Sequence, residues 1–317
     1  MAEQTVEPTQ QTFLRRRIDL LRKQASNPVT IKELRSRMRG RRAFVVLTSY
    51  LAIMSGLIVL IYLAFINSGA TRGSDVQVAG KVLFSAVVGI QGFLVLFVAP
   101  AFTSGAISGE KERQTYDLLR TTLLSAPSFV LGKLVSSLSY VILLILTAVP
   151  LQSFAFLLGG VTFTELILSQ LILIVAAVTV AMFGLYASSR MRTSLGASVL
   201  TFAGILLVTF GFPALISLFA IIASPVLFAS SSTNTESLEI VGIYLGHILA
   251  GFNLPATLIW SDIILVDEGA LFFYSDTIYS RTLFFPSPWP LFILFYGIIA
   301  WILYRLTVRR VRKIAEE

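Results

Sequence analysis

The sequence predicts an all-α integral membrane protein with six transmembrane helices, and three observations lead to this fold class. Hydrophobic residues occupy 56% of the 317 positions and charged residues only 13%, whereas a soluble domain carries about 25% charged residues. Six segments are apolar over the roughly 20 residues that cross about 30 Å of hydrocarbon. The chain has no cysteine and one histidine, which excludes disulfides and a histidine-based zinc site.

The chain begins with a polar segment, residues 1–42, that is rich in arginine. It does not resemble a signal peptide, in which a short apolar core is followed by small residues at a cleavage site. We therefore expect the first apolar segment to remain in the protein as a membrane anchor.

The predicted transmembrane domain covers residues 43–306, and a basic tail follows at 307–317. Its six spans contain no Asp, Glu, Lys, Arg or His and cover residues of about 43–66, 82–104, 134–156, 166–188, 195–222 and 285–304. Only a short hairpin joins the third span to the fourth. A long outer region, 223–284, separates the fifth span from the sixth.

Basic residues predict the orientation of these spans. In the six-span topology, 22 of the 25 Lys and Arg residues lie on the side of the two chain ends, and only Arg72, Lys81 and Arg281 lie on the other. Because Lys and Arg near span ends are retained on the cytoplasmic side, both termini should be cytoplasmic in a plasma-membrane protein. Contact of the basic N-terminus with anionic lipid explains the net charge of +8 without a nucleic-acid partner.

This topology makes a testable prediction. A reporter fused after Glu317 should be cytoplasmic, and a reporter inserted within residues 230–236 should be external, as measured with paired phosphatase and fluorescent-protein fusions. A cytoplasmic signal from the inserted reporter would contradict the six-span topology.

The outer region contains two apolar segments, 238–251 and 256–266, that are too short to cross a membrane. They are expected to be either re-entrant helices or helices that lie flat at the surface, and the sequence leaves both alternatives open. The aromatic residues that follow, within 271–290, suit a belt at the membrane interface. His247 is expected to be a hydrogen-bonded structural residue rather than a proton relay.

The spans also indicate what does not power this protein. Ion-coupled carriers keep ionisable residues within the bilayer, and the predicted spans offer only amides such as Gln91, Gln152 and Gln170. No G-x-x-x-x-G-K-[ST] loop occurs in the chain to hold a nucleotide phosphate. Energy for any work would therefore have to come from a partner protein.

Between the second and third spans, residues 108–124 predict a short polar helix on the cytoplasmic side. Ser108 can cap its first turn, and the carboxylates of Glu110 and Glu112 favour the positive end of the helix dipole. A helical period places Thr115, Leu118, Leu119 and Thr122 on one stripe. Such a helix could transmit movement from a soluble subunit, or it could be an ordinary solvated surface helix.

Residues 100–137 resemble the signature of the permeases of type-2 ABC exporters. The matching positions are Pro100, Glu110-Lys111-Glu112, Thr115, Asp117, Leu118-Leu119 and Gly132-Lys133. Residues 27–44 also resemble the amphipathic, arginine-rich lead-in of that family, and the six-span architecture with a long outer region before the last span is similar. Gln114 departs from the pattern where glycine is frequent, and Leu124 where proline is frequent.

The resemblance implies a transport subunit rather than an enzyme. Two permeases, identical or different, would form a dimer, and each would offer residues 108–124 as a coupling helix to a cytoplasmic ATP-binding subunit. ATP and Mg would bind to that partner, so no cofactor is expected on this chain. The residues implied in partner binding are Glu110, Lys111, Glu112, Arg113, Thr115, Asp117, Leu118 and Leu119.

The resemblance further implies a central cavity lined by the second and fifth spans, with Gln91, Phe93, Phe97, Phe202 and Phe210 as candidates. It does not name the cargo. Two alternatives belong to other classes of protein. One is a secondary carrier or channel that works without an ATPase, and the other is a non-transporting membrane scaffold that recruits a soluble partner.

Overall fold

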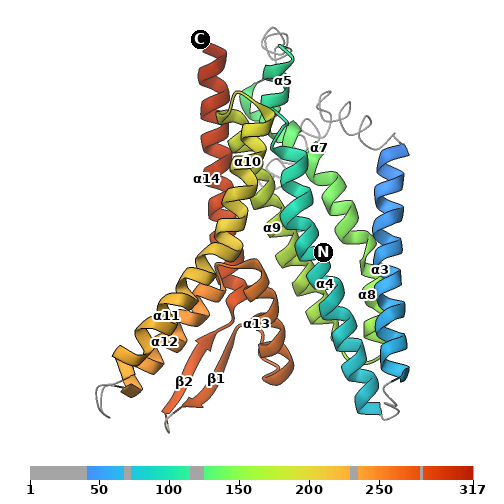
Figure 1. Ribbon diagram of the computed structural model, residues 1–317, viewed down its shortest axis with the longest axis vertical. Helices are drawn as coiled ribbons and strands as arrows, with labels where there is room; N and C mark the ends of the chain where they lie inside the picture. Colours follow the sequence, from blue (N-terminus) through green and yellow to red (C-terminus); the bar gives the residue numbers. More distant parts are fainter. Residues whose placement is uncertain (1–40, 68–72, 115–124, 229–234, 279–280, 317) are drawn as a thin grey trace, which may run out of the picture.

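The computed structural model describes residues 41–67, 73–114, 125–228, 235–278 and 281–316. Within these residues six helical segments are long and apolar enough to cross a membrane, so the chain is a multi-pass, mainly α-helical membrane protein, as the sequence predicts (Figure 1). The segments are Phe44–Asn67, Val76–Glu112, Ala126–Leu157, Phe163–Arg190, Ser194–Ala223 and Pro288–Lys313. Most of the predicted N-terminal segment 1–42 lies outside the described residues.

Several helices extend beyond the predicted spans. Helix α4 (Gly73–Thr103) begins well before residue 82, and α9 (Phe163–Arg190) begins before residue 166. Helix α7 (Ala126–Thr147) begins before residue 134 and is followed by α8 (Val149–Leu157), whose Pro150 lies in the first turn, where a proline without N–H is tolerated. Because of these extensions Lys81, Lys133 and Glu165 lie within helices, although the predicted spans excluded them.

The last helix also differs from its prediction. Helix α14 (Pro288–Glu316) begins later than residue 285 and continues without a break to Glu316, into the residues predicted as a separate tail, 307–317. The basic residues of this region do not interrupt the helix because arginine and lysine are good helix formers.

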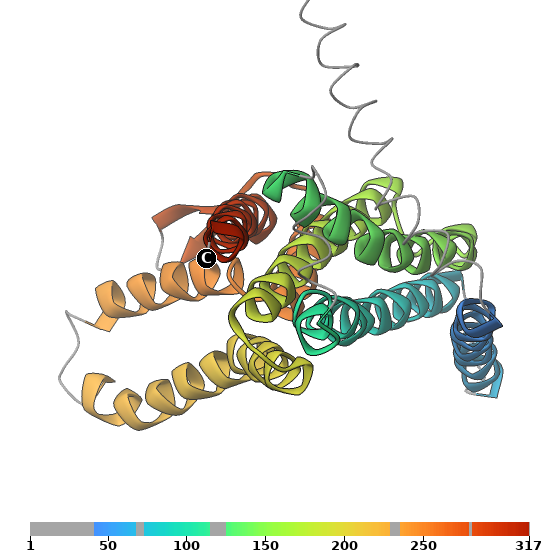
Figure 2. The ribbon, with the colours of Figure 1, turned by 90° about the horizontal axis from the view of Figure 1, so that it is seen from above.

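Helix α9 is the centre of the fold. It packs against α4, α7, α14 and α10 (Ser194–Leu206), and Figure 2 shows it between its neighbours when the molecule is seen from above. Its buried face contains the small residues Ala176, Ala177, Ala181 and Gly184, which allow neighbouring backbones to approach closely in a membrane. Helix α3 (Arg41–Asn67) lies at one edge and leaves most of its apolar surface exposed, as a lipid-facing helix does.

The fifth span is interrupted by a π-helical turn. Helix α10 continues into the π turn η1 (Leu207–Gly211) and then into α11 (Phe212–Phe228). A π turn disturbs the regular carbonyl pattern of an α-helix and often occurs at functional sites. Here the carbonyl oxygen of Thr209 accepts a hydrogen bond of 2.7 Å from Nδ2 of Asn253.

Asn253 belongs to the turn between the two short helices of the outer region, α12 (Thr235–Ala250) and α13 (Leu254–Asp267). The helices bend by 115° at this turn, and the hydroxyl of Tyr296 in α14 donates to the carbonyl of Phe252 at 3.3 Å. Thr209 and Tyr296 both lie within their spans rather than at the ends. The turn therefore packs beside inner residues of two spans.

The segment predicted as an aromatic belt contains an antiparallel hairpin of β1 (Phe273–Ile278) and β2 (Arg281–Pro286). The all-α prediction missed this hairpin, although aromatic and β-branched residues such as Phe273, Tyr274 and Ile278 favour a strand.

The hairpin packs against α12 through His247, which is hydrogen-bonded as predicted. Nδ1 donates to the carbonyl of Ile243 at 3.0 Å. A neutral imidazole then has Nε2 as an acceptor, and the hydroxyl of Tyr274 lies 2.5 Å from it. Burial raises the pKa of Tyr274, which keeps the phenol protonated as the donor.

Candidate functional site

The short helix α5 (Ser108–Glu112) follows α4 through a tight turn at the end of the molecule where α14 also ends (Figure 1). Ser108 was predicted to cap the first turn of this helix, and it does not. Instead Oγ of Ser188 in α9 accepts from the backbone N–H groups of Ile107 and Ser108, each at 2.9 Å. The free N–H groups of a helix start need acceptors, and here the neighbouring span supplies one.

Each of the three charged residues of α5 contacts a different span. Glu110 forms an ion pair with Lys133 of α7, and Nζ of Lys111 donates to the carbonyl of Ser189 in α9 at 2.7 Å.

Glu112 makes the third contact, at the start of α10. Its carboxylate accepts from the backbone N–H of Ser194 at 2.9 Å and from the hydroxyl of the same residue at 2.6 Å. Acceptors at a helix N-terminus satisfy free N–H groups and favour the helix dipole. Helix α5 is thus attached to three spans through three consecutive side chains.

The helix predicted over 108–124 ends earlier. Helix α5 stops at Glu112, and Gln114 has a left-handed backbone conformation with φ of 55°, which does not continue a right-handed helix. Arg113 is exposed. The predicted partner-binding residues Thr115, Asp117, Leu118 and Leu119 lie outside the described residues.

Three glutamines form a buried cluster in the interior. Nε2 of Gln152 donates to Oε1 of Gln91 at 2.8 Å, and Nε2 of Gln170 donates to Oε1 of Gln152 at 2.9 Å. Gln91 also donates to the carbonyl of Ile145 at 3.0 Å. Gln91 was a candidate for the lining of a transport cavity, and this prediction is wrong. Its side chain is buried in the interior of the chain, where its amide in α4 forms hydrogen bonds with residues of α7, α8 and α9.

The other cavity candidates are aromatic residues of α4 and the fifth span, of which Phe93 and Phe210 are exposed and Phe97 and Phe202 are partly buried. The rings of Phe93 and Phe97 are 4.3 Å apart, and those of Phe97 and Phe202 are 6.2 Å apart. Phe93 and Phe210 line a cavity within the chain, whereas Phe97 and Phe202 extend the same aromatic row toward the end of the molecule that contains α5.

At the opposite end of the molecule, an ion cluster joins three helices. Nζ of Lys81 in α4 forms ion pairs with Glu165 of α9 and, at 2.7 Å, with Oδ1 of Asp262 of α13. Glu165 also completes a capping box with Thr162, whose N–H and hydroxyl both donate to Oε1 of Glu165.

This cluster was not predicted from the sequence, because Lys81 and Glu165 each lie one residue outside a predicted span. The spacing of Thr162 and Glu165 was a signal that could have placed the start of α9 before Glu165, since a Thr-x-x-Glu pattern marks a helix N-terminus.

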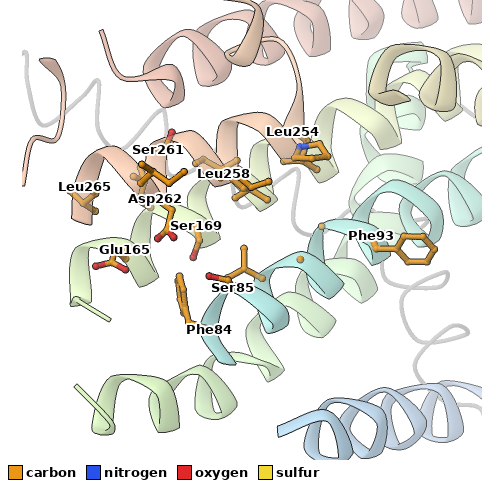
Figure 3. A pocket seen from close by; sticks show the side chains of 18 of the residues that line it. Phe84, Ser85, Phe93, Glu165, Ser169, Leu254, Leu258, Ser261, Asp262 and Leu265 are labelled. Atoms are coloured by element: carbon orange, nitrogen blue, oxygen red, sulfur yellow. The ribbon is translucent and has the colours of Figure 1, made fainter. Parts of the chain in front are cut away.

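The cluster forms one end of a cavity of about 530 Å³ between α4, α9 and α13 (Figure 3). Most of the lining is apolar, with leucine, valine, isoleucine and phenylalanine side chains. Across the described residues, no group of three or more His, Cys, Asp or Glu side chains is arranged to hold a metal ion. The volume and the apolar lining with one polar end suit the binding of a small molecule.

No protein-family model matches the chain, and no curated protein sequence matches it.

Proposed function

We propose that this chain is the permease subunit of an ATP-driven ABC exporter of the type-2 family. It would act in the plasma membrane as a dimer with a second permease subunit, and a cytoplasmic ATP-binding subunit would bind ATP and Mg and hydrolyse the nucleotide. The observation that supports the proposal most is the attachment of Glu110, Lys111 and Glu112, the charged element of the resembled motif, to three different spans.

This attachment provides a mechanism for coupling. A displacement of α5 by a soluble partner would act on α7, α9 and α10 together, because a packed interface moves between discrete arrangements rather than deforming gradually. Helix α9 is the central helix of the fold, so its displacement would reach the remaining spans. Energy released in the cytoplasm could in this way change the side to which the transport pathway opens.

The backbone at Gln114 also supports the proposal. The left-handed conformation there costs an ordinary residue about 1 kcal/mol or more and costs glycine nothing. Glycine is frequent at this position in the resembled family, and the structure supplies a physical reason. The departure at Gln114 is then compatible with the same backbone path.

With α5 in the cytoplasm, we infer that α12 and α13 form a re-entrant hairpin that enters from the outside. Non-helical backbone at membrane depth requires hydrogen-bond partners within the protein. The turn has them, because Tyr296 donates to the carbonyl of Phe252 and Oδ1 of Asn253 accepts from the N–H of Ala256 at 3.2 Å. Helices lying flat at the surface would not place this turn beside Thr209.

The docking of residues 115–119 on the partner can be tested by cross-linking. Because the chain has no cysteine, a single Thr115→Cys substitution should cross-link to a cysteine in the surface groove of the cognate ATP-binding subunit, with a yield that changes when ATP binds. The matched control is Thr71→Cys, which the topology puts on the other side of the membrane and which should give no cross-link. Free labelling of Thr115→Cys by a membrane-permeant maleimide in the assembled complex would refute the docking.

The role of Glu112 can be tested separately. Glu112→Ala should leave ATP hydrolysis by the complex in place but lower the transport per ATP severalfold, because the link from α5 to the start of α10 is lost. Glu268→Ala is a suitable control, since Glu268 is exposed beyond α13 at the opposite end of the molecule. Equal transport by the two variants would show that the contact with Ser194 has no part in coupling.

One observation favours a second candidate function, a secondary carrier. The ion cluster of Lys81, Glu165 and Asp262 places ionisable groups on helices of the membrane domain, and such groups bind coupling ions in carriers. Transport in vesicles that contain no ATP, driven by an imposed ion gradient, would distinguish a carrier from the ABC permease.

A further inference from the structure

We propose that the cavity between α4, α9 and α13 is a binding site for an amphiphile that joins a cationic, ammonium-type head to an apolar body. The site lies within one chain, so binding there requires no ATP-binding partner and does not depend on the proposed function. The volume of about 530 Å³ falls within the roughly 300–1,000 Å³ that is usual for small-molecule sites.

The cavity has a polar end. Figure 3 shows the carboxylates of Glu165 and Asp262 and the hydroxyls of Ser85 and Ser169 around the same space between α13 and α4. Lys81 lines this end as well and donates to both carboxylates. The polar groups therefore come from three helices and meet at one place.

The charges at this end do not balance. Two carboxylates and one ammonium line it, and the other lining residues are uncharged, so one negative charge is in excess beside a largely apolar wall. The side chain of Glu165 is buried and that of Asp262 is only partly exposed, and such charges are costly unless they are paired, which favours a second cation and disfavours an anionic head.

The hydrogen bonds indicate where the second cation would bind. Glu165 uses Oε2 for Lys81 and Oε1 for Thr162, whereas Lys81 engages Oδ1 of Asp262. We assign the carboxylate of Asp262 as the acceptor for the ammonium head, and Ser85 lines the same cavity.

The other end of the cavity is apolar and open. Leu254, Leu258 and Phe93 lie along it (Figure 3). Gly89 and Gly92 line the same stretch of α4 and present no side chain, and a Cβ added at Gly89 would meet no atom within 4 Å. This end provides room for the apolar body of the ligand, at a fixed distance from the charged head.

The test uses the absence of cysteine in the chain. A single Ser85→Cys variant is purified in nanodiscs of phosphatidylglycerol, which has no ammonium head, and its rate of labelling by N-ethylmaleimide is measured with decyltrimethylammonium or decyl sulfate below their micelle concentrations. The cationic compound should slow the labelling by at least about tenfold at saturation, and the anionic compound should not. A Ser275→Cys control, exposed on β1, should be labelled at the same rate in all conditions.

Two further substitutions test the two ends of the cavity. Asp262→Asn, made in the Ser85→Cys background, should weaken protection by the cation about tenfold or more. Gly89→Leu should abolish protection by filling the apolar end, and it should fold well because leucine is a better helix former than glycine. Equal protection by both compounds, protection by neither, or unchanged protection in both variants would overturn the proposal.

The ammonium head could belong to a soluble amphiphile or to a bilayer lipid, and the composition of the nanodisc separates these sources. If phosphatidylethanolamine occupies the site, labelling of Ser85→Cys should already be slow in nanodiscs of that lipid and fast in phosphatidylglycerol. If the ligand is a soluble amphiphile, labelling should be fast in both lipids until decyltrimethylammonium is added. Either pattern supports the cationic site, while slow labelling in phosphatidylglycerol alone would contradict it.

Discussion

Replacing Lys81 with methionine should destabilise the protein by about 3 kcal/mol. Lys81 is the shared partner of Glu165 and Asp262, so its removal leaves two carboxylates facing each other without a cation. Removing one member of a buried ion pair costs roughly 3–5 kcal/mol. We expect the lower end of this range, because the side chain of Glu165 is 3% exposed but those of Lys81 and Asp262 are 24% and 22% exposed.

The measurement is the free energy of unfolding in mixed micelles, followed by circular dichroism as a denaturing detergent is added. Lys81→Arg is the matched control and should lose much less, because the positive charge is kept. The double variant Lys81→Met with Asp262→Asn should be more stable than Lys81→Met alone, since one unbalanced carboxylate is gone. If Lys81→Met and Lys81→Arg unfold together, the ion cluster does not stabilise the junction of α4, α9 and α13.

Replacing Gly184 with alanine should also destabilise the protein, by about 1–3 kcal/mol, the usual cost of overpacking a core. A Cβ at Gly184 would lie 2.1 Å from Oγ1 and 3.0 Å from Cβ of Thr103, and 3.3 Å from the backbone N of Ser104. Thr103 is fully buried, and its hydroxyl donates to the carbonyl of Ala99 at 3.0 Å. The side chain of Thr103 cannot move aside without losing this bond, so α4 and α9 would have to separate.

The control is Gly56→Ala in α3, where an added Cβ would meet nothing within 4 Å. Alanine favours a helix over glycine by roughly 0.5–1 kcal/mol, so the control should be as stable as the unsubstituted protein or slightly more stable. The same chemical change should therefore have opposite effects at the two positions when both variants are unfolded in mixed micelles. A Gly184→Ala variant as stable as Gly56→Ala would show that α4 and α9 do not approach as closely as described.

The membrane class, the six spans and the hydrogen-bonded state of His247 could all be predicted from the sequence. Apolar runs of about 20 residues are local features that a bilayer selects by length. A lone imidazole on an apolar helix is likewise expected to be hydrogen-bonded, because burying an unpaired polar group costs free energy. The resemblance to ABC permeases, the orientation and the partner-binding role of residues 110–119 stay predictions.

The limits of the helices could not be predicted as well. Lys81, Lys133 and Glu165 look like flanking residues when spans are recognised by their lack of charge. Each charge lies inside a helix because a partner on another helix balances it, and the partner is not visible in the local sequence. The early end of α5 could not be predicted either. Gln114 has a left-handed backbone, and glutamine is not a residue type that by itself indicates the end of a helix.

By itself, the sequence determined that the chain is an α-helical membrane protein, because the balance between apolar runs and charges is a property of each segment. Only the tertiary structure decided which polar groups meet. Lys81 is separated by 84 positions from Glu165 and by 181 positions from Asp262, and the three come together only where α4, α9 and α13 pack. Helix packing alone also joined Gln91 to Gln152 and Gln170, since a buried amide must find its hydrogen-bond partner on whichever helix lies beside it.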